Sequence, residues 1–148
     1  MKGRRVYLIA FAGYCALMVW LLFGRERYAL SQVTANINPM PLETILRFIH
    51  VLVGDFSADM KRHAVVNLVG NVVMFVPLGF FAALLWRPFR PLWRCALLGG
   101  GIIVCVELTQ LLIRVGSCDF DDLLLNVVGI CMGYGLLRLR RKKMTSEG

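Results

Sequence analysis

Four blocks of predominantly apolar residues, separated by more polar connectors, set the pattern of the chain. They cover residues 6–23, 64–85, 95–113 and 122–139. At a rise of about 1.5 Å per residue, each block is long enough, or nearly so, to cross the roughly 30 Å hydrocarbon core of a membrane as an α-helix. The pattern therefore predicts an all-α integral membrane protein, built as a bundle of four transmembrane helices.

The first connector, residues 24–63, contains a shorter element. Turn signals around Pro41 are followed by apolar side chains at helical spacing, namely Leu42, Ile45, Leu46, Ile49 and Leu52. This run is too short to span a bilayer, and its spacing favours an interfacial or re-entrant helix. We expect an amphipathic helix over residues 41–53, with the proline at or just before its start.

Composition favours a membrane protein with one domain. The chain has 148 residues, of which 58% are hydrophobic and 18% are charged, against about 45–50% and about 25% in soluble domains. A single domain fits this length. The five cysteines form neither a CxxC pair nor a zinc-ligand spacing with histidine, so we expect neither a disulfide framework nor a cofactor.

The basic residues behind the net charge of +8 stand at the ends of the apolar blocks, where membrane topology explains them without nucleic-acid binding. One side carries Lys2, Arg4, Arg5, Arg87, Arg90, Arg94, Arg138, Arg140, Arg141, Lys142 and Lys143. The other carries fewer over longer loops, namely Arg25, Arg27, Arg47, Lys61, Arg62 and Arg114. We therefore expect cytoplasmic N- and C-termini, with a basic cytoplasmic tail over residues 140–148 and an outward-facing first connector. The first block lacks a small-residue cleavage site, so it is expected to be a retained anchor.

Polar side chains interrupt three of the apolar blocks at matching depth. Pairs at helical spacing lie on one face of each block: Asn67 with Asn71, Glu107 with Gln110, and Asp122 with Asn126. Ionisable groups inside a bilayer normally face protein or water. The pattern predicts an outward-facing polar cavity among the last three spans. Candidate binding residues are Asn38, Asn67, Asn71, Glu107, Gln110, Arg114, Asp119, Asp121, Asp122 and Asn126.

Structural roles compete with binding at most of these positions. Hydrogen bonds between helices are the structural explanation for the asparagines of the second block. Asp119 has the position of an N-cap, with Asp121 and Asp122 in the first turn next to the positive end of the helix dipole. Other positions have structural interpretations of their own: snorkelling for Arg114, close helix packing for Gly129 and Gly133, and a kink for Pro77.

Four motifs in order resemble one family. They are "NPMPLETI" (residues 38–45), "NLVGNVVMFVPLGF" (67–80), "VELTQLL" (106–112) and "DFDDLLLNVVGICMGY" (119–134), and together they are similar to the VanZ family of bacterial membrane proteins. The resemblance implies the bacterial cytoplasmic membrane and an association with resistance to the lipoglycopeptide antibiotic teicoplanin. Two positions depart from the family pattern: Leu42 stands where the family has Phe, and Gly116 where it usually has Arg.

Three functional hypotheses follow. In the preferred one, the protein is not an enzyme, and its cavity binds a lipid-linked envelope precursor, a lipoglycopeptide or another amphiphile. In the second, Glu107 and Asp122 are catalytic in a membrane hydrolase or transferase acting on a lipid phosphate or ester, with Asp119, Asp121 and Asp122 as a candidate metal site. The third is proton- or ion-coupled transport through Glu107. Membrane lipids are expected partners, and four spans leave room for a homo-oligomer.

Overall fold

A computed structural model describes residues 2–24, 37–38, 40–112 and 118–146. The elements are α1 (Lys2–Val19), the π-helix η1 (Trp20–Gly24), β1 (Ile37–Asn38), α2 (Glu43–Val53), α3 (Ala58–Leu85), the 3-10 helix η3 (Arg87–Phe89), α4 (Leu92–Leu112), β2 (Cys118–Asp119) and α5 (Phe120–Ser146). Four helices are long and apolar enough to cross a membrane: α1 with η1, α3, α4 and α5. The predicted all-α membrane fold is thus confirmed, and one pair of two-residue parallel strands accompanies it.

Two helices extend beyond their apolar blocks. Helix α3 begins at Ala58, six residues before the expected span, where the Ser57 hydroxyl accepts a hydrogen bond from the Met60 amide at 3.4 Å. Helix α5 continues as far as Ser146 through most of the segment interpreted as a basic tail. Arginine and lysine are good helix formers, and their charge is favourable near a helix C-terminus, so this end of the chain continues the helix.

Helices α3 and α5 form the centre of the bundle because glycines let their backbones meet. A Cβ atom added at Gly129 would overlap the carbonyl oxygen of Val72, and one added at Gly133 would overlap that of Val76. From the other side, a Cβ at Gly79 of α3 would overlap the carbonyl oxygen of α5 residue Ile130. Small residues at such crossings are how membrane helices gain packing contacts in the absence of a hydrophobic driving force. The predicted packing role of Gly129 and Gly133 is confirmed.

Helix α1 covers this centre through aromatic and polar contacts. Phe11 packs edge-on against Phe81 and Trp86, with ring centroids 5.7 and 5.1 Å apart. The Tyr14 hydroxyl donates to the Met74 carbonyl at 2.9 Å. This bond lies next to the Val73 carbonyl, which is the one that Pro77 leaves without its helical donor.

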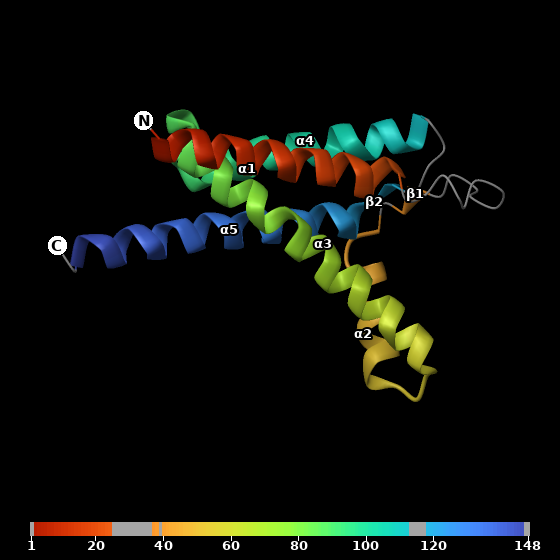
Figure 1. Ribbon diagram of the computed structural model, residues 1–148. Helices are drawn as coiled ribbons and strands as arrows, with labels where there is room; N and C mark the ends of the chain where they lie inside the picture. The colour runs from red at the N-terminus through yellow and green to blue at the C-terminus, as the bar shows by residue number, and fades with distance from the viewer. Residues whose placement is uncertain (1, 25–36, 39, 113–117, 147–148) are drawn as a thin grey trace.

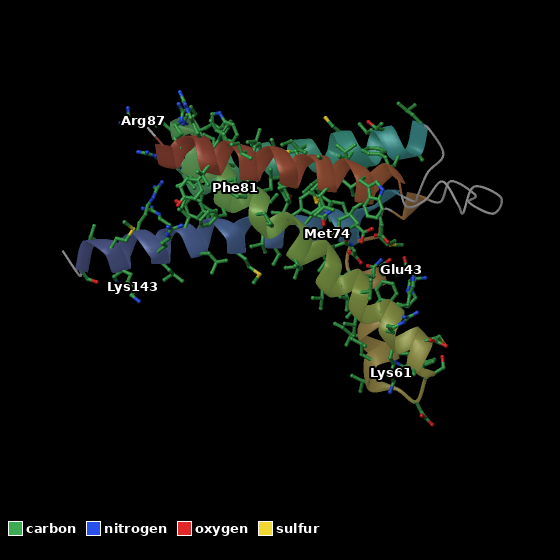
Figure 2. The ribbon with its side chains drawn as sticks, viewed as in Figure 1. Glu43, Lys61, Met74, Phe81, Arg87 and Lys143 are labelled. Atoms are coloured by element: carbon green, nitrogen blue, oxygen red, sulfur yellow. The ribbon has the colours of Figure 1, made fainter. Side chains whose placement is uncertain are left out.

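The helices separate toward one end of the molecule. Figure 1 shows α3 crossing α5 obliquely, with α2 beside the N-terminal half of α3 and away from α1 and α4. A helix of 28 residues measures about 42 Å, more than the roughly 30 Å of hydrocarbon, and an oblique course accommodates that excess. Figure 2 places Arg87 and Lys143 at the end opposite Glu43 and Lys61. Two of the three predicted cytoplasmic basic clusters thus share one end of the bundle.

Candidate ligand-binding site

Asp121 attaches α2 to the first turn of α5. Its side chain is completely buried, and its two oxygens accept hydrogen bonds from the backbone amides of Leu42 at 2.6 Å and Ile45 at 3.0 Å. The first amides of a helix have no partner within that helix, and Leu42 at the N-cap position of α2 supplies no side-chain hydrogen bond. A carboxylate from α5 therefore takes the place of a local capping residue.

A second carboxylate joins the same two helices through a hydroxyl. Asp119 Oδ1 accepts from the Asp121 amide at 2.9 Å, which confirms its predicted role as the N-cap of α5. Its other oxygen, Oδ2, accepts from the Thr44 hydroxyl at 2.6 Å. Thr44 Oγ1 in turn accepts from the Arg47 guanidinium at 3.0 Å. The result is a chain of hydrogen bonds from the start of α5 to a cationic side chain on α2.

The third carboxylate faces α3. Asp122 Oδ1 accepts a hydrogen bond from the Asn71 side-chain amide. This contact confirms that Asn71 bonds between helices, and it brings together two of the predicted site residues. Each of the three acidic side chains at the start of α5 therefore has a different partner: the α2 backbone, Thr44, or α3.

A cavity of about 530 Å³ lies where α2, α3 and the start of α5 diverge. Its described lining combines polar and apolar side chains: Thr44, Arg47, Phe48, Val51, Met60, His63, Asn67, Asp119 and Asp122. The Phe48 and His63 rings meet edge-on with centroids 5.8 Å apart. The cavity differs from the sequence expectation in one wall, because α2 contributes to its lining and α4 does not.

Two asparagines of the predicted site have a buried side-chain oxygen. Asn67 Oδ1 and Asn126 Oδ1 are buried and have no hydrogen-bond partner within the part of the chain that the structure describes. Asn126 itself is only 5% exposed. Buried amide oxygens are normally satisfied, and an exception calls for an explanation such as a bound molecule. Of the two, Asn67 lines the 530 Å³ cavity.

The α4 candidates lie elsewhere. Gln110 Nε2 donates to the Leu22 carbonyl at 2.8 Å, so this side chain joins α4 to the π-helix η1. Glu107 is half-buried with its Oε2 atom inaccessible, and neither residue is part of the described cavity lining. Leu22 lies near the C-terminal end of η1, where helix carbonyls lack a partner within the helix, so a side-chain amide is a favourable donor there. The catalytic and transport roles of Glu107 stay predictions.

Two other candidates lie partly or wholly outside the described residues. Asn38 is placed by its backbone alone, in β1, where it pairs with Asp119. Arg114 lies outside the described residues, as does Gly116 at the second departure from the family pattern. The first departure, Leu42, has a φ of 67° in the left-handed region.

The candidate metal site is formed by three acidic side chains, Asp119, Asp121 and Asp122. Among the described residues, no three His, Cys, Asp or Glu side chains are arranged to hold a metal ion. The Asp121 oxygens both accept from backbone amides, and those of Asp119 accept from an amide and a hydroxyl. Asp119 and Asp121 are thus engaged in joining helices, and the candidate metal site at Asp119, Asp121 and Asp122 stays a prediction.

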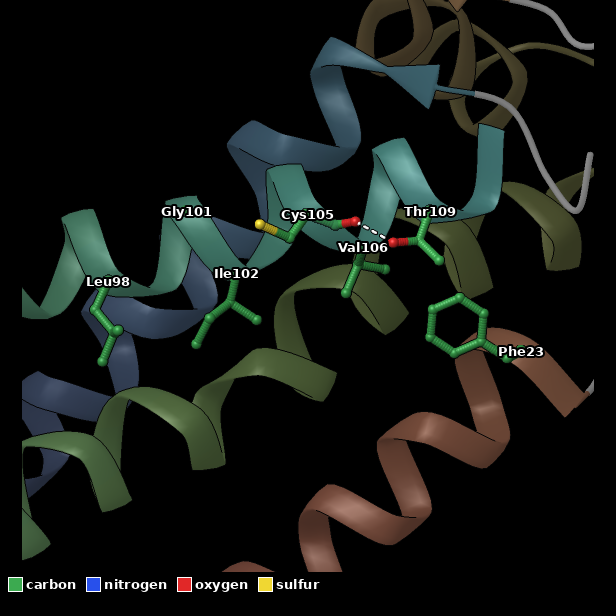
Figure 3. A pocket seen from close by; sticks show the side chains of 7 residues that line it. All are labelled: Phe23, Leu98, Gly101, Ile102, Cys105, Val106 and Thr109. Carbon is green, nitrogen blue, oxygen red and sulfur yellow. Dashed lines mark hydrogen bonds between the residues drawn. The ribbon is translucent and has the colours of Figure 1, made fainter. Parts of the chain in front are cut away.

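A second hollow of about 450 Å³ runs along α4 and is almost entirely apolar. Figure 3 shows its lining on α4, from Leu98 to Thr109, with Phe23 of η1 on the opposite side. Thr109 is its one hydroxyl, and that group donates to the Cys105 carbonyl at 2.7 Å. A surface of this kind inside a membrane-spanning segment is compatible with lipid chains, since the hydroxyl among its described lining residues is already bonded within α4.

Three polar lining residues were not among the candidates predicted from the sequence: Thr44, Arg47 and His63. Arg47 was counted only as a topology charge, and Thr44 only as part of the first motif. One signal could have identified Thr44: it is a polar side chain on the first turn of an amphipathic helix, among apolar neighbours. Nothing local distinguishes Arg47 from an exposed interfacial arginine, since its role depends on the contact of α2 with α5.

These features define a polytopic α-helical membrane protein, with a cavity of mixed polar and apolar lining where α2, α3 and the start of α5 diverge. The model of the VanZ/LLP1 family matches residues 11–141, nearly the whole chain. The chain therefore belongs to the VanZ/LLP1 family. Among curated proteins and solved structures, none matches it significantly.

Proposed function

We propose that this protein is a non-enzymatic binding protein of the bacterial cytoplasmic membrane, whose cavity holds the head group of an amphiphilic envelope molecule. The observation that carries the proposal is the 530 Å³ cavity with a mixed lining on helices that belong to a membrane-spanning bundle. Apolar walls with a few convergent polar groups are typical of ligand sites. Phe48, Val51 and Met60 provide the apolar part, while Arg47 and Asn67 provide polar groups.

The proposed orientation follows from the basic residues. With the Arg87 and Lys143 end in the cytoplasm, as the positive-inside rule favours, the cavity faces the outer leaflet. Lipid-linked precursors and acylated glycopeptides of the teicoplanin type combine an acyl chain with a polar head, and both are in the ligand class. Capture of such a molecule at the outer surface is the proposed link to glycopeptide resistance.

The experiment compares lipid retention by two tryptophan variants using native mass spectrometry of purified protein. Val51 is 9% exposed and lines the cavity, whereas Val53 on the same helix is 84% exposed. Val51→Trp fills the cavity and is expected to lose the co-purifying amphiphile by more than about tenfold, while Val53→Trp retains it. Circular dichroism checks that both variants keep their helices.

Two outcomes would count against the proposal. One is a wild-type protein that retains no amphiphile under conditions that preserve its fold. The other is equal retention by Val51→Trp and Val53→Trp, since a molecule bound only to the outer surface of the bundle would ignore the filled cavity.

A further inference from the structure

The cavity has two chemically different sides. Arg47 of α2 is its one arginine or lysine among the described lining residues, and its guanidinium has no carboxylate partner in the described part of the chain. Asn67 and Asp122, from α3 and α5, bring oxygen acceptors to the same cavity. A guanidinium offers five N–H donors in a fork that matches phosphate oxygens, so one side is suited to an anion and the other to hydrogen-bond donors.

The cationic side is held in position. Thr44 is 5% exposed and gives its hydroxyl hydrogen to Asp119 Oδ2, which leaves its oxygen lone pairs available to Arg47. Asp119 also caps α5, so its own position is fixed. This arrangement reduces the number of conformations that the long arginine side chain samples before it meets a ligand. A pre-organised guanidinium loses less entropy on binding.

The acceptor side needs donors from a ligand. Asn67 Oδ1 is buried without a described partner. Asp122 uses Oδ1 for the Asn71 amide, and no described hydrogen bond engages its other oxygen. An anionic group next to these oxygens would be repelled, while a hydroxyl or ammonium group would satisfy them. The anion and the donors of a suitable ligand must therefore be separate groups, the anion beside Arg47 and the donors beside Asn67 and Asp122.

We propose that the cavity recognises a phosphate ester whose alcohol part carries hydrogen-bond donors, as in phosphoethanolamine, phosphoglycerol or phospho-sugar head groups. The phosphate contacts Arg47, and the hydroxyl or ammonium donors contact Asn67 and Asp122. This assignment rests on the proposed function and specifies its ligand class. It excludes phosphocholine head groups, because a quaternary ammonium has a charge but no N–H donor.

The test uses delipidated protein titrated with phosphatidylethanolamine, phosphatidylglycerol or phosphatidylcholine of identical acyl chains and read by native mass spectrometry. Wild-type protein is expected to retain the first two lipids about tenfold better than phosphatidylcholine, since buried acceptors left without donors weaken binding by about that factor. Equal retention of all three lipids would overturn the assignment, although a lipid-binding cavity would still stand. Retention of none of them would also overturn the assignment, while the proposed function is decided separately by the amphiphile that co-purifies with wild type and with Val51→Trp.

Variants assign the two sides. Arg47→Gln is expected to weaken all three lipids about tenfold, and Arg47→Lys to weaken them less. Arg62→Gln, an equal charge change on an exposed α3 position that does not line the cavity, should have little effect. Asn67→Leu should reduce the preference for phosphatidylethanolamine over phosphatidylcholine. Equal lipid retention by Arg47→Gln and Arg62→Gln would refute the contact of the phosphate with Arg47. An unchanged preference for phosphatidylethanolamine in Asn67→Leu would refute the contact of the ligand donors with Asn67.

Soluble head groups distinguish lipid from free phosphate ester. Glycerophosphoethanolamine, added in excess to the phosphatidylethanolamine complex, should displace the lipid only weakly if the apolar lining holds part of the acyl region. Full displacement at equimolar concentration would identify a soluble phosphate ester as the ligand. In that case the head-group chemistry would be retained, and the proposed amphiphile would be wrong.

Discussion

Replacing Asp121 by Asn tests whether one carboxylate of α5 holds α2 in place. The substitution keeps size and shape, so it creates no cavity. One of the two carboxylate oxygens becomes an amide nitrogen, which is a donor. Either the Leu42 or the Ile45 amide then loses its acceptor, since both oxygens of Asp121 are in use.

The magnitude follows from burial and charge. A buried donor left unsatisfied costs about 1–3 kcal/mol, and loss of a negative charge beside a helix N-terminus adds about 0.3–1 kcal/mol. Because Asp121 is fully buried, water cannot replace the missing acceptor. We expect the free energy for opening α2 to fall by about 2 kcal/mol, which corresponds to roughly thirtyfold faster amide exchange.

Hydrogen–deuterium exchange of the purified protein in nanodiscs measures this directly. Peptides from Glu43–Val53 should exchange faster in Asp121→Asn, while peptides from the C-terminal half of α5 keep their protection. Asp59→Asn is the matched control, because Asp59 is an exposed acid in the first turn of α3 and loses only its effect on the dipole. Exchange of α2 within threefold of wild type in Asp121→Asn would refute the capping role of this carboxylate.

Three further substitutions test the packing. Gly133→Ala should lower the free energy of unfolding by about 1–3 kcal/mol, because the new Cβ meets an α3 carbonyl. Gly135→Ala is the control and should change this free energy little, because the space around Gly135 is open. Equal thermal midpoints for the two variants would contradict the packing role of Gly133. Tyr14→Phe removes the hydrogen bond to Met74 and should cost about 0.6–1.7 kcal/mol in chemical unfolding, and no measurable loss would show that the bond contributes nothing. Leu42→Gly should keep or raise the thermal midpoint, because φ is 67° there, while Leu42→Val should lower it; the reverse order would exclude the left-handed conformation.

The spans could be predicted because the constraint on them is local. A helix must cover the hydrocarbon thickness with apolar residues, so block length alone identified all four. Helix ends were less well determined. The start of α3 depends on Ser57, and the end of α5 includes a basic segment that hydropathy cannot distinguish from an irregular tail.

The candidate site could be predicted from the sequence only in part. The polar pattern put Asn71 and Asp122 in one predicted cavity, and the structure joins them by a hydrogen bond. It placed Gln110 in the same group, although that side chain bonds to the Leu22 carbonyl. Depth fixes the height of a residue in a bilayer, whereas the direction of its side chain depends on helix rotation. Rotation is set by contacts such as the glycine crossings of α3 and α5, which a single sequence does not specify.

The acidic cluster illustrates how far local interpretation reaches. Three carboxylates within four residues suggest metal binding or helix capping from the sequence. In the structure, Asp119 caps its own helix, while Asp121 caps a helix 76 residues earlier in the chain at Ile45. Since Asp119 also contacts Thr44, the start of α5 determines where α2 lies and how Arg47 is oriented. Asp119 and Asp121 therefore position the α2 wall of the cavity. Asp119 and Asp122 also line the cavity themselves. We therefore expect a change in Asp119 or Asp121 to alter ligand binding through the position of α2, although Asp121 is not among the described lining residues of the cavity.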